Sequence, residues 1–319
     1  MSFNHSQMEA IHHEKGPAMI LAGPGSGKTT VITNRTKYLI ETCHVDPARI
    51  LVITFTKAAA QEMQERFSKL VGTEANRVTF GTFHSVFFRI LKYAYHYNAS
   101  NIARDEERIL FMKEITEQMG LETEDINEFC LSILSEISII KNDQIDLNHY
   151  YAKNCSEEIF RVLYEKYEAR MMRENKIDFD DMLLMTYELF SARKDILELW
   201  RKQYQYILID EFQDINKVQY EVVRMLAAPD NNLFIVGDDD QSIYRFRGAK
   251  PEIMLGFEKD YPNLKKILLN VNYRSTQTIV KAASNLISHN RIRFPKTIES
   301  AQESGQMLAV HLCQDVYEE

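Results

Sequence analysis

The sequence predicts an α/β protein whose parallel sheet is interrupted by an all-helical insertion. Short apolar runs alternate with helical segments in the first third of the chain and again after residue 200. Strands that alternate with helices at this spacing are typical of parallel βαβ units. Between residues 92 and 176 only helical periodicity is present, and acidic residues outnumber basic ones there. We therefore interpret this stretch as an excursion from a single α/β domain.

Each expected strand is a short apolar run, and each expected helix carries apolar residues three and four positions apart. The strands are expected over residues 17–22, 49–55, 77–83, 204–210 and 232–238. A Gly-rich turn follows the first strand and leads into a helix that extends to about Ile40. A second, strongly amphipathic helix is expected over residues 57–70.

Composition limits the classes of protein that this chain can belong to. Its 319 residues, 45% of them hydrophobic, can bury a substantial core and suggest about two domains. The net charge is −8, so any face for nucleic acid must be local. Four scattered cysteines without a C-x-x-C pair argue against zinc, iron–sulfur clusters and a disulfide scaffold. The N-terminus is too polar for a signal peptide, and no apolar run approaches the roughly 20 residues of a membrane span. We therefore expect a cytoplasmic protein without a membrane partner.

The string AGPGSGKT, residues 22–29, lies between an expected strand and an expected helix, the context in which it indicates a P-loop. Its glycines let the backbone wrap a phosphate at a helix N-terminus. Lys28 would neutralise the β- and γ-phosphates, and the Thr29 hydroxyl would coordinate Mg²⁺. The first consensus glycine is replaced by alanine, which is a mild departure. The expected phosphate-binding residues are Ala22, Gly23, Pro24, Gly25, Ser26, Gly27, Lys28, Thr29 and Thr30.

A P-loop needs carboxylates on a neighbouring strand, and ILIDEFQD at 207–214 supplies them. Asp210 is expected in the shell of the metal, and Glu211 is expected to orient and deprotonate the attacking water. Together with the P-loop, this pair predicts a nucleoside triphosphatase. A GTPase is disfavoured because the nearest match to N-K-x-D, NKVQ at 216–219, lacks the aspartate. A small-molecule kinase would usually carry a lid of basic residues.

The stretch VGDDDQSIYRFRGAK, residues 236–250, combines two opposite chemical characters. Its acidic half repels phosphate, whereas its second half alternates aromatic and basic residues, which suits a single nucleic-acid strand. Neither a GTPase nor a small-molecule kinase accounts for such a loop.

An ordered set of strings resembles the UvrD/Rep/PcrA-type superfamily 1 DNA helicases from residue 3 to about residue 290. The order and the rough spacing of the whole set are far more specific than any single string. The strings are FNHSQMEAI (3–11), AGPGSGKT (22–29), VITFTKAAAQEM (52–63), GTFHS (81–85), IDFDDML (177–183), LIDEFQDIN (208–216), GDDDQSIYRFRGA (237–249) and LNVNYRS (269–275).

The resemblance implies an ATP site that extends beyond the P-loop. Gln7 resembles the adenine-reading glutamine of the family, and Arg35 and Tyr273 resemble the pair that sandwiches the adenine ring. Gln241 resembles the γ-phosphate sensor. Arg274 resembles the arginine that crosses from the second motor domain and stabilises the charge developed in phosphoryl transfer. The implied cofactors are ATP and Mg²⁺.

The resemblance also implies contacts with single-stranded DNA. Tyr244, Phe246 and Arg247 resemble strand-contacting residues of the family, and so do Phe55 and His84. Phe55 could equally be buried at a strand end, and His84 could be a structural histidine. Many relatives carry tryptophan at the position of Phe246, so we expect a weaker hold with retained function, since one stacked base contributes about 1–3 kcal/mol. The acidic and aromatic loop would thus connect the nucleotide with the DNA.

By the same resemblance, residues 1–91 and 177–268 would form one RecA-like motor domain that contains the ATP site. Residues 92–176 would be a helical insertion in that domain. The carboxylates of DFDD could be mistaken for a metal cluster, but Asp178 is expected to cap the helix at which the chain returns from the insertion.

Residues 269–319 would begin a second RecA-like domain and leave it incomplete. One helix is expected over 275–290 and one strand over 306–313. A motor of this type closes two domains around ATP, so a single domain has nothing to close against. We therefore expect the 319-residue chain alone to show little DNA-stimulated ATPase and no strand separation.

The implied function is ATP hydrolysis coupled to 3′→5′ translocation on single-stranded DNA, by the N-terminal part of an ATP-dependent DNA helicase. The expected partners are single-stranded DNA and duplex junctions, and the sequence identifies no protein partner. Two alternatives stay open. One is the helicase portion of an AddA/RecB-like helicase–nuclease, and the other is a non-catalytic, ATP-switched DNA-binding module.

Overall fold

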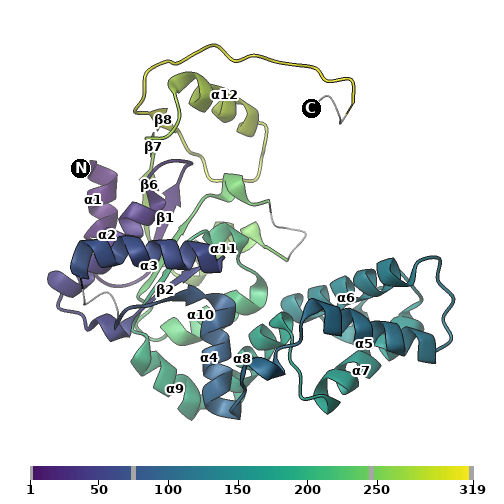
Figure 1. Cartoon of the computed structure of the whole chain (residues 1–319). Coiled ribbons are helices and arrows are strands. Elements are labelled where there is room, and N and C mark those ends of the chain that lie inside the picture. Colours follow the sequence, from purple (N-terminus) through teal and green to yellow (C-terminus); the bar gives the residue numbers. More distant parts are fainter. Residues whose placement is uncertain (1–2, 73–76, 244–247, 316–319) are drawn as a thin grey trace.

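The computed structural model describes residues 3–72, 77–243 and 248–315, and at its centre lies a parallel sheet of six strands. The strand order is β3-β2-β4-β5-β1-β6 (Figure 1). The strands are β1 (Ala18–Ala22), β2 (Ile50–Thr54), β3 (Thr79–Thr82), β4 (Tyr206–Ile209), β5 (Leu233–Gly237) and β6 (Lys265–Leu269). The predicted α/β class is therefore confirmed.

Helices cover both faces of the sheet, as parallel strands that are buried along their whole length require. Every residue of β1, β2, β4 and β5 is buried. One face packs against α4 (Phe83–Tyr95), α8 (Phe179–Ala192), α9 (Lys194–Gln203), α10 (Lys217–Ala227) and α11 (Pro251–Asp260). The other face packs against α1 (His5–Ile11), α2 (Lys28–Glu41) and α3 (Lys57–Val71).

Strand β6 is present although the sequence pattern does not predict it. It lies at the edge of the sheet and pairs with β1. Its first two residues, Lys265 and Lys266, are exposed, while Ile267 and Leu269 are buried. Charged residues are common on edge strands because they discourage pairing with another chain. The two lysines also shorten the apolar run, so the sequence pattern does not indicate a strand here.

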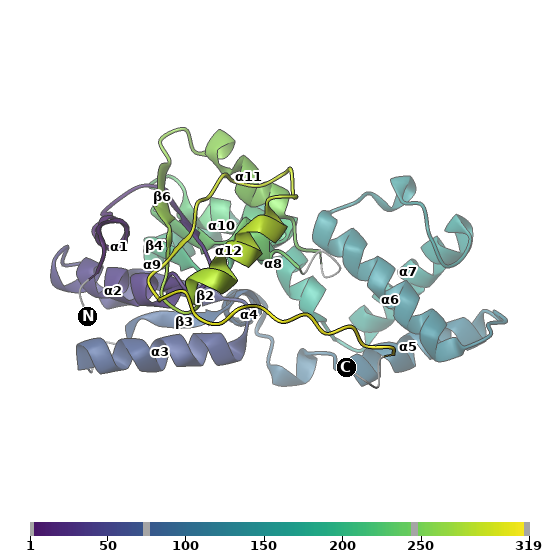
Figure 2. The same ribbon diagram turned by 90° about the horizontal axis from the view of Figure 1, so that it is seen from above.

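The insertion consists of α5 (Asp105–Gln118), α6 (Ile126–Asp143) and α7 (Glu157–Arg173). These helices share an apolar cluster of their own, separate from the two clusters on the sheet. Figures 1 and 2 both show them side by side, projecting from the α/β body. Helix α4 continues past the predicted limit at residue 91, and the division into domains stays a prediction. In the described part of the chain, every helix is too short or too polar to cross a bilayer.

A buried group of charges joins the insertion to the α/β body. Lys141 Nζ, near the end of α6, lies 2.6 Å from Asp181 Oδ1, 2.8 Å from Glu168 Oε1 and 3.5 Å from Asp178 Oδ2. Asp178 caps α8 and forms a capping box with Asp181, so the predicted helix cap is confirmed. Burial alone would lower the pKa of Lys141, but the three carboxylates outweigh it and hold that pKa well above its usual value. Burial and the neighbouring Asp178 raise the pKa of Asp181 to about 7.

The last part of the described chain forms little regular structure. Helix α12 (Gln277–Ile287) lies where a helix was expected, and β7 (Val271–Asn272) pairs with β8 (Glu299–Ser300). The strand predicted over 306–313 is absent, and those residues are exposed without regular structure. A strand needs a neighbour for its backbone N–H and C=O groups, and in the described part of the chain this segment pairs with none.

Candidate nucleotide site and nucleic-acid interface

The predicted P-loop connects the end of β1 to the start of α2. Gly25 has φ 64° and Gly27, which caps α2, has φ 86°, and both values favour glycine. A Cβ on Gly25 would come within 2.7 Å of Arg274 Cβ, and a Cβ on Gly23 would come within 2.7 Å of Ile298 Cδ1. Glycine is therefore required at this turn both by the backbone conformation and by close packing from the end of the chain.

The lysine of the P-loop lies against the Glu211 carboxylate, which follows β4. Lys28 Nζ lies 2.7 Å from Glu211 Oε2, although 183 residues separate them in sequence. Glu211 also accepts a hydrogen bond of 3.0 Å from Gln213 Nε2. Its φ of 50° is unusual for a residue with a side chain, and such backbone strain is found at functional sites. Burial and the nearby charge of Glu211 raise the pKa of Asp210 to about 6, against the opposing effect of Lys28.

The turn fits a bound phosphate chain. It leads directly into the N-terminus of a helix of 14 residues, where backbone N–H groups and the helix dipole favour an anion. The hydroxyl of Ser26 is buried and has no hydrogen-bond partner among the described residues. A buried polar atom without a partner is rare and calls for a ligand or a water. The turn thus offers one lysine charge, backbone donors and a free hydroxyl to a single anionic group.

Helix α1 and the segment after β7 meet at the same turn. Gln7 is buried and donates a 3.0 Å hydrogen bond from Nε2 to the carbonyl of Ser26. The N–H of Tyr273 donates to the carbonyl of Gly25 at 3.0 Å, and the hydroxyl of Tyr273 accepts from Asn4 Nδ2 at 2.9 Å. The structure therefore brings both Gln7 and Tyr273 to the P-loop. Their roles toward adenine stay predictions.

The structure does not support the role expected for Arg35. Its side chain is only 2% exposed and lies with its guanidinium 4.4 Å from the centre of the Phe234 ring. Its Nε and Nη1 have no hydrogen-bond partner among the described residues, and burial lowers its pKa to about 9. An adenine ring can stack only on a face that is open to it. Arg35 instead packs between α2 and β5. The prediction that Arg35 stacks on adenine is therefore corrected.

The two remaining predicted nucleotide contacts, Gln241 and Arg274, differ in whether their side chains are held by hydrogen bonds. Gln241 follows β5 and donates a 2.7 Å hydrogen bond from Nε2 to Asp238 Oδ2. The Cβ of Arg274 lies beside Gly25, and the N–H of Arg274 donates to Asn272 Oδ1 at 2.8 Å. The guanidinium of Arg274 is exposed and makes no hydrogen bond or ion pair with the described residues. It is thus near the P-loop and free to turn toward a bound group.

Phe55 and His84 line one hollow of about 700 Å³ between the α/β body and the insertion. The ring of Phe55 contacts that of Phe83, with centroids 5.6 Å apart. The ring of His84 lies 5.1 Å from that of Phe179 in an edge-to-face arrangement. Burial lowers the pKa of His84, against an opposing effect of Asp178, so the ring is neutral at pH 7. Aromatic rings beside a hollow of this size can stack on the bases of a strand.

Phe179 is a lining residue that the sequence reasoning missed. Its side chain is 46% exposed even though it follows directly after the fully buried Asp178. The string DFDD predicts a helix cap, and the aromatic residue next to that cap is the signal in the sequence for this contact. Tyr244, Phe246 and Arg247 lie outside the described residues.

We expect Phe179→Ala to weaken single-strand binding. Loss of one stacking ring costs about 1–3 kcal/mol, or roughly 5- to 150-fold in affinity, with little dependence on base sequence. Fluorescence anisotropy with a labelled oligothymidylate and a mixed-sequence oligonucleotide measures this effect. Leu199→Ala, at an exposed apolar position of α9 outside the hollow, is the matched control and should bind as the parent does. Equal affinities for all three proteins would show that Phe179 does not contact the strand.

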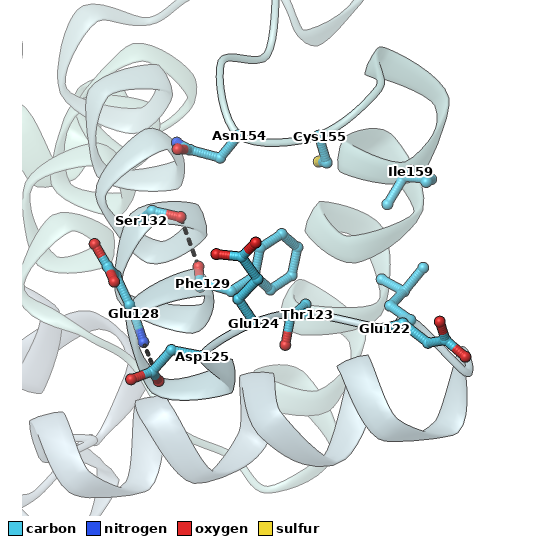
Figure 3. A pocket seen from close by; sticks show the side chains of 11 residues that line it. Glu122, Thr123, Glu124, Asp125, Glu128, Phe129, Ser132, Asn154, Cys155 and Ile159 are labelled. Carbon is cyan, nitrogen blue, oxygen red and sulfur yellow. Dashed lines mark hydrogen bonds between the residues drawn. The ribbon is translucent and has the colours of Figure 1, made fainter.

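A second hollow, of about 500 Å³, lies at the far end of the insertion (Figure 3). Its wall carries the carboxylates of Glu122, Glu124, Asp125 and Glu128, and its described lining contains no lysine or arginine. This local charge repels a phosphodiester backbone. The charge of this lining therefore disfavours a nucleic-acid strand at this end of the insertion.

One family model, for the UvrD/REP helicase N-terminal domain, matches residues 3–262. The chain is 41% identical to YjcD of Bacillus subtilis (strain 168), over all of this chain and 43% of that protein. It is 39% identical to the ATP-dependent DNA helicase PcrA of Leuconostoc citreum, over 99% of this chain and 43% of that protein. It is 38% identical to PcrA of Bacillus subtilis (strain 168), over 95% and 41%. The chain thus spans less than half the length of these curated relatives.

Proposed function

Because the chain belongs to the UvrD/REP helicase family, we propose that it binds and hydrolyses ATP as the N-terminal part of an ATP-dependent DNA helicase. The observation that carries this proposal is the 2.7 Å approach of Lys28 Nζ to Glu211 Oε2 at the mouth of the P-loop. This contact places the lysine that would bind phosphate next to the carboxylate that would activate water. Family membership alone does not require that geometry in this chain.

The residues at the turn fit Mg²⁺ as well as ATP. Thr29 and Asp210 would hold the ion, which would neutralise negative charge on the phosphates. Mg²⁺ is usually held by one or two carboxylates together with substrate phosphates.

The chain's own residues divide the work of hydrolysis. Lys28 would leave Glu211 for the phosphates, which frees the Glu211 carboxylate to orient a water and accept its proton. Gln213 then keeps its 3.0 Å hydrogen bond to Glu211 and fixes the direction of the carboxylate. Gln241 and the exposed Arg274 would complete the site on the γ-phosphate side, where negative charge develops.

We place a single DNA strand along the hollow that contains Phe55, His84 and Phe179. Stacking on these rings is tolerant of sequence, as a translocating protein requires. The sequence of Tyr244, Phe246 and Arg247 supports further contacts three to six positions after Gln241. Movement in the 3′→5′ direction and a preference for duplex junctions belong to this proposal. We also assign the protein to the reducing cytoplasm, since all four cysteines are free.

The proposal predicts ATP turnover that single-stranded DNA accelerates in the protein that carries this chain. Phosphate release with and without oligothymidylate measures the turnover, and a 3′-tailed duplex in a gel assay measures strand separation. A 5′-tailed duplex is the matched control for polarity and should not be unwound. Nucleotide-dependent DNA affinity without any turnover would contradict the proposal and favour a non-catalytic switch.

A further inference from the structure

Three consecutive aspartates after β5 form ion pairs with two basic side chains that lie more than 50 residues further along the chain. Lys296 Nζ lies 2.5 Å from Asp238 Oδ1, 2.5 Å from Asp239 Oδ1 and 2.9 Å from Asp240 Oδ2. Arg293 binds Asp240 with two hydrogen bonds, of 2.7 Å from Nε and 2.6 Å from Nη2. Two of the three negative charges in the acidic half of the loop that follows β5 are therefore offset within the protein, which weakens its repulsion of DNA.

The ammonium group of Lys296 is almost entirely removed from water. Its side chain is 1% exposed, and the side chains of Asp238 and Asp239 are 1% and 2% exposed. Burial alone would lower the pKa of Lys296, but the aspartates outweigh it and raise that pKa. Buried ion pairs of this kind often add little net stability, because desolvating the charges offsets their attraction. They do fix geometry, since a displaced partner leaves a buried charge uncompensated.

Asp238 also belongs to a continuous chain of hydrogen bonds that ends at the P-loop. Asp238 Oδ2 accepts from Gln241 Nε2 at 2.7 Å, and the Asp238 N–H donates to Gln213 Oε1 at 2.9 Å. Gln213 Nε2 donates to Glu211 Oε2 at 3.0 Å, and Lys28 Nζ donates to that same oxygen at 2.7 Å. One side chain, that of Gln213, thus separates Asp238 from the carboxylate that would activate water.

We propose that Lys296 is a positioning residue for ATP hydrolysis. By holding Asp238, it sets the position of Gln241 directly and that of Glu211 through Gln213. This inference rests on the proposed ATPase function, which it deepens. Lys296 lies on the segment between α12 and β8, so any movement of that segment would displace the side chains of Gln241 and Glu211. Lys296 itself touches no group that reacts.

The test compares Lys296→Met, which removes the charge and keeps the length, with Lys296→Arg, which keeps the charge. Lys281→Met, at an exposed position of α12, is the matched control. ATP turnover and the affinity for a fluorescent ATP analogue are measured in the protein that carries this chain. Misplacing catalytic groups by about 1 Å costs up to about 100-fold, so we expect kcat to fall about 10- to 100-fold in Lys296→Met. Nucleotide affinity should stay within about twofold of the parent, because Lys296 does not touch the P-loop. Lys296→Arg should recover much of the rate.

Three outcomes overturn the inference. The first is a parental kcat in Lys296→Met. The second is an equal loss of rate and nucleotide affinity accompanied by a lower melting temperature, which indicates a purely structural role. The third is a parent without turnover, which refutes the proposed function itself and the inference with it. Should Lys296→Met fail to fold, Asp239→Asn decides, because Asp239 binds Lys296 without touching Gln241 or Gln213. A lower kcat at unchanged nucleotide affinity supports the inference there, and an unchanged kcat contradicts it.

Discussion

Glu211→Gln is expected to lower the rate of ATP hydrolysis by about 10²- to 10⁴-fold while nucleotide affinity stays close to that of the parent. The amide cannot accept a proton from water, which removes general-base catalysis. Its oxygen can still accept the hydrogen bonds that Lys28 and Gln213 now donate to the Glu211 carboxylate, so the shape of the site is kept. Single-turnover hydrolysis and titration with a fluorescent ATP analogue measure the two quantities separately.

Lys28→Ala is the informative comparison for that variant. It should abolish hydrolysis and also weaken nucleotide binding, because it removes the only P-loop cation. The two variants thus separate chemistry from binding. Turnover at the parental rate in Glu211→Gln would show that another group activates the water, and turnover at the parental rate in Lys28→Ala would remove the catalytic assignment altogether.

Lys141→Met is expected to lower the free energy of unfolding by about 3–5 kcal/mol, because the buried Asp181 loses its ion-pair partner and Asp178 keeps only Arg108, whose Nε lies 3.5 Å from Asp178 Oδ2. Lys141 is 1% exposed, and Asp178 and Asp181 lie within 3.5 Å of its Nζ. The loss should depend on pH. The pKa of Asp181 is already about 7, and removing Lys141 raises it further. Below pH 7 that carboxyl is protonated in both proteins, whereas at pH 8 the variant must bury a charge or bind a proton. The deficit should therefore be larger at pH 8 than at pH 6.

Urea denaturation followed by circular dichroism at both pH values measures this effect. Lys166→Met, at an exposed position of α7, is the matched control and should unfold with the parent. A deficit in Lys141→Met that is equal at both pH values would show that packing, and not charge, dominates at this position.

Much of the fold was predictable because β1, β2, β4 and β5 are almost entirely apolar and buried on both faces. Sequence patterns fail where burial is partial. Strand β6 carries two exposed lysines at its start, and only its pairing with β1 makes it a strand. Residues 306–313 have the opposite problem, since they are apolar enough for a strand but pair with nothing in the described chain. Strand identity thus depends on partners that local pattern does not contain.

The candidate site shows the same limit at the level of side chains. The positions of Lys28 and Glu211 were predictable because the glycine spacing and the end of a strand fix their backbones. Lys28 Nζ lies 2.7 Å from Glu211 Oε2. Arg35 was wrongly placed because a helical position alone does not say which face of α2 turns toward the sheet. The partnership of Lys296 with Asp238 had no sequence signal at all, since a tertiary contact between distant loops creates it.

The position of β1 in the sheet has a consequence for synthesis on the ribosome. β1 emerges well before its neighbours, β5 and β6, which lie about 200 residues or more further along the chain. At about 5–20 residues per second, the nascent chain carries this apolar strand unpaired for about 10–40 s. The insertion depends on nearby contacts and can fold during that interval. The turn after β1 therefore acquires its native surroundings long after it is made, so chaperone capture of the nascent chain is expected to centre on residues 18–22.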